Sequence, residues 1–171
     1  MRIWLARHGA TAWSGLRYCG KADPPLTQDG RSQADDLREL LGREAESAVI
    51  WSSPARRALE TAARSGSTVV VDARLSEVDF GEVEGSTFED LAARHPEIAR
   101  RVVGGETRID WPGGEPWVDL EQRVEAVWQA IVAGSVDAVV ISHAGPLRVL
   151  ARLATGREIH LVPGSYLFTS R

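Results

Sequence analysis

The sequence contains little cysteine, little lysine and no long apolar run. Its single cysteine, Cys19, has no partner for an intramolecular disulfide, which excludes a secreted scaffold held by disulfides. No apolar segment approaches the roughly 20 residues that a membrane span needs. The apolar stretch at the start of the chain is too short for a signal peptide and is interrupted by Arg7. We therefore expect a cytoplasmic protein that does not bind membranes.

Basic residues are also fewer than acidic ones. The 171 residues include 24 acidic and 20 basic ones, giving a net charge of −4. This balance disfavours a nucleic-acid partner, because non-specific binding to nucleic acid depends on excess positive charge. Lys21 is the only lysine, so the other basic residues are arginines. Either a GC-rich genome explains this bias, or some arginines bind phosphate or carboxylate through the planar guanidinium group.

Short apolar segments alternate with amphipathic ones along most of the chain. Strands are predicted over residues 3–6, 48–51, 69–71 and 138–141, with an edge strand over 166–169. One helix is predicted to follow an N-cap at Thr27 and to end at Leu41, before Gly42. A second is predicted to follow an N-cap at Ser53, with Pro54 as its first residue. Two more are predicted over residues 118–133 and from Gly145 to Ala154. The alternation predicts a three-layer α/β/α sandwich with a mostly parallel sheet and an antiparallel edge strand.

Residues 75–116 have a different composition. Six glycines punctuate this stretch, and it contains one predicted helix over 86–95. We interpret it as a loop-rich excursion that covers the functional edge of the sheet, within a single domain spanning residues 1–171.

Polar side chains follow each predicted parallel strand. In chain order they are Arg7 and His8, then Ser52, Ser53, Arg56 and Arg57, then Arg74 and Glu77, and finally Ser142 and His143. Ligands of such sheets bind beyond the carboxyl ends of the strands. Two imidazoles, several arginines and one carboxylate at this edge suit an anionic ligand, and phosphate suits them best.

Those side chains can together cleave a phosphomonoester. The reaction needs neutralisation of the phosphoryl charge, an in-line nucleophile and an acid for the leaving oxygen. Arginines supply the first, a neutral imidazole the second, and a carboxyl group of raised pKa the third. A metal hydrolase would use the same histidines with Asp23 or Asp79, but no H-x-H or H-E-x-x-H spacing supports it.

The ordered set of motifs resembles the histidine phosphatase superfamily, also called the phosphoglycerate mutase-like family. The main matching stretches are Arg7-His8-Gly9 with Thr11, Ser52-Ser53-Pro54-Ala55-Arg56-Arg57-Ala58 with Thr61, Leu75-Ser76-Glu77-Val78-Asp79-Phe80-Gly81, and Ser142-His143-Ala144-Gly145. Weaker matches are Pro25-Leu26-Thr27 with Gly30 and Gln33-Ala34, then Glu84-Gly85, and Pro112-Gly113-Gly114-Glu115. Together they span most of the chain, and the resemblance implies a phosphoglycerate mutase-like fold.

The resemblance also implies a role for each matching residue. His8 corresponds to the nucleophile that becomes phosphohistidine, and His143 to the second histidine that stabilises charge on the phosphoryl group. Glu77 corresponds to the proton donor for the leaving group. Arg7 and Arg57 correspond to the phosphate-binding arginines, with Arg57 preferred over Arg56. The family chemistry requires no metal or other cofactor.

The first motif departs from the family pattern. Ala10 stands where the family often has glutamate, and Ser14 where it often has asparagine. The loop between Ser14 and Gly20 is about one residue shorter than the family pattern, which also puts Arg17 in doubt as a site residue. We expect Thr11 and Ser14 to contact phosphate, since a serine hydroxyl can still donate one hydrogen bond.

Several activities fit the resemblance. Mutases of the family are longer and carry a basic insertion after the glutamate motif, whereas residues 80–85 are short and acidic, which favours a phosphatase. Phosphohistidine phosphatases generally lack the Glu77 motif. Residues 79–81 and 112–115 resemble the α-ribazole phosphatase and broad-specificity branch, making α-ribazole 5′-phosphate a candidate substrate. A phospho-ligand binding module would be expected to lack His8, Glu77 or His143, and all three are present.

Other features remain open. Trp13, Trp111 and Trp117 either line a pocket for an apolar leaving group or serve packing alone. His95 and His160 are interpreted as structural or surface residues. The expected partner is a small-molecule phosphate ester, and the sequence leaves a homodimer open.

Overall fold

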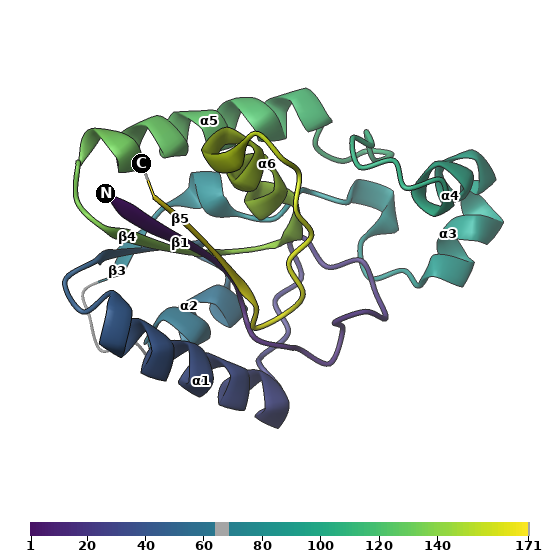
Figure 1. Cartoon of the computed structure of the whole chain (residues 1–171). Coiled ribbons are helices and arrows are strands. Elements are labelled where there is room, and N and C mark those ends of the chain that lie inside the picture. The colour runs from purple at the N-terminus through teal and green to yellow at the C-terminus, as the bar shows by residue number, and fades with distance from the viewer. Residues whose placement is uncertain (64–68, 171) are drawn as a thin grey trace.

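The computed structural model describes residues 1–63 and 69–170, and its centre is a five-stranded sheet (Figure 1). The strands are β1 (Arg2–Arg7), β2 (Val49–Ser52), β3 (Val69–Val71), β4 (Ala138–Ser142) and β5 (Tyr166–Ser170), in the order β3-β2-β4-β1-β5. The pairs β1–β4, β2–β4 and β2–β3 are parallel, whereas β5 is antiparallel to β1 at the edge. The predicted α/β sheet and its antiparallel edge strand are thus confirmed.

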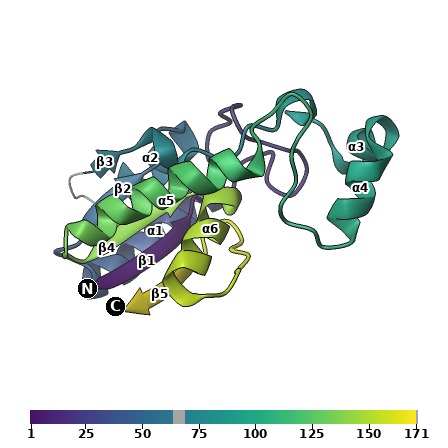
Figure 2. The same cartoon turned by 90° about the horizontal axis from the view of Figure 1, so that it is seen from above.

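Two helices cover each face of the sheet, forming the predicted three layers (Figure 2). Helices α1 (Gln28–Glu44) and α2 (Arg56–Ala63) lie on one face, and α5 (Trp117–Ala133) and α6 (Ala144–Thr155) on the other. The side chains of β1 alternate between the faces: Ile3 and Leu5 pack with α5 and α6, and Trp4 and Ala6 with α1 and α2. All four are fully buried, which stabilises the large ones by roughly 1.5–3 kcal/mol each.

Among the helices that cover the sheet, the predicted end of α1 and the predicted start of α2 are wrong. The predicted N-cap at Thr27 is confirmed, since its side chain accepts a hydrogen bond from Gly30 N, but α1 continues through Gly42 to Glu44. Gly42 does not adopt the left-handed conformation that ends a helix, and the amide of Ala45 still bonds to Leu41 O at 2.6 Å. Helix α2 begins at Arg56 instead of Pro54, because the Ser53 hydroxyl accepts from Ala55 N in a local turn.

The segment between β3 and α5 extends beyond the sheet (Figures 1 and 2). It contains the short 3-10 turns η1 (Ala73–Leu75) and η2 (Gly81–Val83) and the helices α3 (Phe88–Arg94) and α4 (Pro96–Val103). The predicted helix over 86–95 is real but begins at Phe88, after a capping box of Thr87 and Asp90. Helix α4 was not predicted, although proline suits the first turn of a new helix. That this segment and the sheet form one domain over residues 1–171 stays a prediction.

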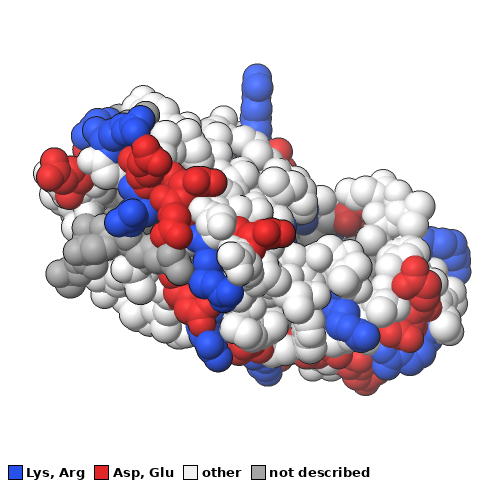
Figure 3. Space-filling view, turned by 90° about the horizontal axis from the view of Figure 1, so that it is seen from below, with Lys and Arg blue, Asp and Glu red and all other residues white. Residues whose placement is uncertain are grey.

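Two further observations concern the charged surface and the helices. On the face shown in Figure 3, basic and acidic side chains interleave and form no broad basic patch. Among the described residues, no helix is long and apolar enough to cross a membrane.

Candidate active site

The residues predicted to bind and transfer phosphate meet at the carboxyl ends of the strands. Arg7, His8, Arg57 and Glu77 line a cavity of about 170 Å³, which we call the phosphate cavity, together with Thr11 and Ser14. His143 is fully buried beside it, with its ring centroid 5.0 Å from that of His8. The fold therefore brings all seven predicted site residues into one cluster.

His8 is held as a neutral imidazole with one nitrogen free. Its Nδ1 lies 2.7 Å from Gly9 O, and because a carbonyl only accepts, Nδ1 carries the proton and Nε2 keeps its lone pair. Burial lowers the pKa of His8 to about 3, helped by the charges of Arg57 and Arg7 and opposed by the bond to Gly9. His8 therefore has the protonation state of a nucleophile across the neutral range.

Contacts with two helices fix the loop that carries His8. The amide of Gly9 donates to Thr61 Oγ1 on α2 at 3.1 Å, and Thr61 donates in turn to Arg57 O. A side chain at Gly9 would overlap the carbonyl of Gly30 at the start of α1. Glycine is therefore required here so that α1 can pack directly on the loop.

His143 is also neutral, and its tautomer follows from its neighbour. Its Nε2 lies 2.8 Å from the hydroxyl of Ser53, which itself accepts a hydrogen bond from Ala55 N. Within the described residues the hydroxyl proton has no acceptor other than Nε2, so we assign it to this bond and the imidazole proton to Nδ1. This Nδ1 is buried and has no hydrogen-bond partner within residues 1–63 and 69–170. Burial holds the pKa of His143 well below its ordinary value, so it is an uncharged donor beside His8.

The two arginines are anchored by backbone carbonyls. Arg57 is buried and donates to Ala22 O at 2.8 Å and Gly20 O at 3.0 Å, and its ion pair with Asp23 is long, at 3.4 Å. Arg7 donates to Leu161 O at 2.8 Å, and its Nε is buried without a partner in the described part of the chain. Carbonyls orient a guanidinium group but do not neutralise it, so positive charge is left for an anion.

Glu77 lies where the loop after η1 meets the start of α6. Its Oε1 accepts from Val78 N and from Gly145 N, both at 3.0 Å. Burial raises the pKa of Glu77, although these two bonds and Arg7 act in the opposite direction. A Cβ on Gly145 would lie 2.5 Å from Glu77 Oε1, so glycine is needed for this approach. A carboxyl group in this environment holds a proton at higher pH than an ordinary glutamate.

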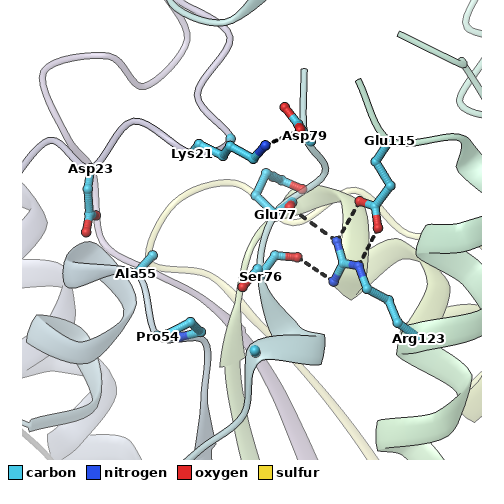
Figure 4. A pocket seen from close by; sticks show the side chains of 11 residues that line it. Lys21, Asp23, Pro54, Ala55, Ser76, Glu77, Asp79, Glu115 and Arg123 are labelled. Atoms are coloured by element: carbon cyan, nitrogen blue, oxygen red, sulfur yellow. Dashed lines mark hydrogen bonds and ion pairs between the residues drawn. The ribbon is translucent and has the colours of Figure 1, made fainter. Parts of the chain in front are cut away.

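The loop that carries Glu77 is held by Arg123 of α5, a residue the sequence interpretation missed. Arg123 donates to Ser76 O at 2.8 Å and Glu77 O at 3.2 Å (Figure 4). The same guanidinium group donates to Arg74 O at 2.7 Å. It also forms a two-pronged ion pair with Glu115, at 2.6 and 2.8 Å. The motif containing Glu115 was visible in the sequence, but nothing there indicated its partner.

Thr11 and Ser14 line the phosphate cavity but bond to one another. The Ser14 hydroxyl accepts from Thr11 N at 2.9 Å and lies 3.3 Å from Thr11 Oγ1. Arg17 also lines this cavity while donating to Gly85 O. The phosphate contacts of Thr11 and Ser14 therefore stay predictions.

Two larger cavities adjoin the phosphate cavity, and Glu77 lines all three. The acidic cavity, of about 520 Å³, is lined by Lys21, Asp23, Asp79, Glu115 and Arg123 (Figure 4). The aromatic cavity, of about 370 Å³, is lined by Tyr18, Phe80, Trp111, Trp117, Arg148 and His160. Trp111 and Trp117 thus line a cavity as hypothesised, and Trp13 lines the phosphate cavity.

The described side chains offer few groups that could bind a metal ion together. Within the described parts of the chain, no group of three or more histidine, cysteine, aspartate or glutamate side chains is arranged to hold a metal ion. Asp23 and Asp79, the carboxylates considered for a metal hydrolase, instead pair with Arg57 and Lys21.

Comparisons with known proteins agree with this geometry. Phosphoserine phosphatase 1 of Hydrogenobacter thermophilus is 32% identical over 88% of this chain and 74% of its own length. A phosphoglycerate mutase structure from Thermus thermophilus superposes with a TM-score of 0.80 and 32% identity, covering 98% of this chain and 92% of that one. A mycobacterial glucosyl-3-phosphoglycerate phosphatase, solved with VO3, has a TM-score of 0.86 and 28% identity, covering 99% and 92%.

These likenesses agree with the family that the motifs indicated but do not single out the α-ribazole phosphatase branch. The chain spans 44% of the length of mycobacterial curated relatives that it matches at 39% identity. The model of the histidine phosphatase superfamily, branch 1, matches residues 3–165. The chain therefore belongs to the histidine phosphatase superfamily.

Proposed function

We propose that the protein is a metal-independent phosphomonoesterase that acts through a phosphohistidine at His8. The observation that carries this proposal is the neutral, buried His8, which lines a cavity together with Arg7 and Arg57, two arginines held mainly by backbone carbonyls, with one long ion pair from Arg57 to Asp23 at 3.4 Å. Such a site attracts a phosphate dianion and presents a nucleophile that needs no deprotonation.

The first chemical step transfers the phosphoryl group to the enzyme. His8 Nε2 attacks phosphorus in line, an N–P bond forms and the P–O bond to the leaving group breaks. Arg7 and Arg57 offset the charge of the non-bridging oxygens, and His143 Nδ1–H donates to one of them. Glu77 gives its proton to the leaving oxygen, which departs as an alcohol.

The second step returns the enzyme to its starting state. The Glu77 carboxylate takes a proton from a water molecule as the water oxygen attacks phosphorus. The N–P bond breaks, inorganic phosphate leaves, and His8 regains its neutral form. Each cycle therefore consumes one ester and one water, and Glu77 ends protonated as it began.

Two observations favour hydrolysis over mutase chemistry. A mutase must retain its product beside the phosphohistidine, whereas here two cavities open at Glu77 and offer the leaving group a way out and water a way in. The segment after Glu77 is the short turn η2, with acidic residues in place of a basic insertion. The substrate we propose is a small phosphate ester in the cytoplasm, with α-ribazole 5′-phosphate among the candidates.

A phosphate-release panel tests this function. It contains α-ribazole 5′-phosphate, phosphoserine, sugar phosphates, 3-phosphoglycerate and a phosphohistidine peptide, each with and without EDTA. We expect release from small esters that EDTA does not change. Loss of activity restored by added metal would contradict the mechanism. Conversion of 3-phosphoglycerate to 2-phosphoglycerate in the presence of the bisphosphate, without free phosphate, would establish the mutase instead.

A further inference from the structure

The two cavities beside Glu77 offer a leaving group opposite electrostatic surroundings. The acidic cavity contains the carboxylates of Asp23, Asp79 and Glu115, and both of its cations are already paired. Lys21 pairs with Asp79, and Arg123 with Glu115 at 2.6 Å (Figure 4). An anionic leaving group would find no unpaired lysine or arginine among the described residues that line this cavity.

The aromatic cavity instead contains a guanidinium group that has no counterion among the described residues. Arg148 lies one turn into α6, is half-buried, and makes no hydrogen bond or ion pair within residues 1–63 and 69–170. By contrast, Arg152 on the next turn of α6 bonds to Glu121 at 2.9 Å. Glu106, which also lines the aromatic cavity, is paired with Arg101 at 2.7 Å. The positive charge of Arg148 is therefore unbalanced within this cavity.

The position of Arg148 also suits the binding of an anion in this cavity. Its charge lowers the pKa of Arg7 and of His160, although burial is the larger cause in both groups. Like charges gathered without a counterion cost free energy, and binding of an anion relieves that cost. Because Arg7 lines the phosphate cavity, Arg148 is placed to bind a second anionic group on the same substrate.

The other walls of the aromatic cavity define the body of the leaving group. Tyr18, Phe80 and Trp111 form a cluster in which ring centroids lie 4.9 to 5.3 Å apart. These rings and Trp117 offer apolar faces suited to a flat or apolar group. The cavity joins the phosphate cavity at Tyr18, Phe80 and Glu77, so a group placed here remains attached at the oxygen that Glu77 would protonate.

We propose that the aromatic cavity binds the leaving group, and that Arg148, with His160 at the rim, binds a carboxylate on it. This inference rests on the proposed phosphatase function. The substrate class is a phosphomonoester whose leaving group has a flat or apolar body and a carboxylate distant from the phosphate. We favour a carboxylate over a second phosphate because one guanidinium group balances the single negative charge of a carboxylate, whereas a phosphate monoester carries nearly two.

Two esters of equal size test the subsite. They are 4-carboxyphenyl phosphate and 4-carbamoylphenyl phosphate, which differ in the charge of one planar group. The protein should prefer the carboxylate ester by about tenfold in kcat/KM, the effect of one charge-assisted hydrogen bond. Most of the preference should appear in KM, since the carboxylate lies away from the reacting atoms.

Substitutions on α6 test whether Arg148 causes the preference for the carboxylate ester. Arg148→Met should lower kcat/KM for the carboxylate ester about tenfold more than for the amide ester, and Arg148→Lys should restore part of the difference. Arg152→Met is the matched control, because it removes the next arginine of the helix outside all three cavities, and it should keep the full preference.

The outcomes separate this inference from the proposed function. Equal use of the two esters by the wild-type protein, or equal losses with Arg148→Met, would overturn the carboxylate subsite and leave the phosphatase intact. Hydrolysis of neither ester by the wild-type protein would instead overturn the proposed function, and the subsite with it.

Discussion

The two sides of the site are built differently. On the sheet side, His8 and His143 directly follow β1 and β4, and Arg57 lies in the first turn of α2. All three are buried and fixed by hydrogen bonds to neighbouring strands, helices or loops. On the loop side, Glu77, Phe80 and Trp111 belong to a long segment without strands, which Arg123 and Gly145 tether to the helices. In the proposed mechanism the sheet side contacts the phosphoryl group that every substrate shares, and the loop side contacts the leaving group that varies. Substitutions on the two sides should therefore differ in how strongly their effects depend on the substrate.

His8→Ala should have the largest effect and the least dependence on substrate. It removes the nucleophile, so kcat should fall on the order of 10⁴-fold or more for good and poor leaving groups alike. Phosphate release from 4-nitrophenyl phosphate and phosphoserine measures this. His95→Ala, which removes a histidine outside the three cavities, is the control. Retention of either activity in His8→Ala would contradict the proposed nucleophile.

Glu77→Gln should act selectively. Poor leaving groups need the proton and should slow about 10²- to 10⁴-fold, whereas 4-nitrophenyl phosphate should change little. Because burial raises the pKa of Glu77, the wild-type rate with poor leaving groups should fall as pH rises through that raised value, and this alkaline decline should be absent from the variant. The pH profile of kcat/KM measures both effects. Equal slowing of the two substrate classes would argue against an acid role.

Gly145→Ala should disturb the contact between the two sides. The new methyl group would lie 2.5 Å from Glu77 Oε1, so the carboxyl group must shift. We expect a loss of about tenfold for poor leaving groups and a smaller loss for 4-nitrophenyl phosphate, since small displacements of a catalytic group are costly. Gly42→Ala is the matched control, because its added methyl meets no neighbouring atom within 4 Å. Unchanged rates in Gly145→Ala would show that Glu77 does not need this approach.

The sheet side could be predicted from the sequence because local patterns determine it. Apolar runs placed the strands, and polar residues after them identified His8, Arg57 and His143. The loop side could be predicted only in part. Glu77 was found by resemblance, but the bonds from Arg123 to Ser76 and Glu77 join residues more than 45 positions apart and leave no local pattern. The same holds for the unpaired state of Arg148, which depends on what its neighbours already bind.

The start of α2 shows how a functional contact can override a helix signal. Ser53 and Pro54 have the composition of a helix N-terminus, yet α2 begins at Arg56. The Ser53 hydroxyl instead accepts from Ala55 N and bonds to His143 Nε2. A good capping residue was therefore used to set the tautomer of a buried imidazole, which composition alone does not reveal.

The last expected effect concerns stability, and it has opposite signs on the two sides. Unfolded His8 takes up a proton below its ordinary pKa of 6.5, whereas the folded protein holds that pKa at about 3. The unfolded state therefore binds more protons between these values, and His8 costs about 2 kcal/mol of stability at pH 5. Glu77, whose pKa is raised, binds more protons in the folded state, so its contribution to stability decreases as pH rises above its ordinary value.

Urea unfolding at pH 7 and pH 5, without phosphate, separates these contributions. Going from pH 7 to pH 5, the wild-type protein should lose about 2 kcal/mol more than His8→Gln, which has no group to titrate there. Glu77→Gln should lose more than the wild type over the same interval, because it lacks the proton uptake that favours the folded state. His143 is present in all three proteins, so its own cost cancels in these differences. Equal pH dependence in the wild type and His8→Gln would mean that the imidazole is not held neutral, and the sheet side would then lack its nucleophile in the required form.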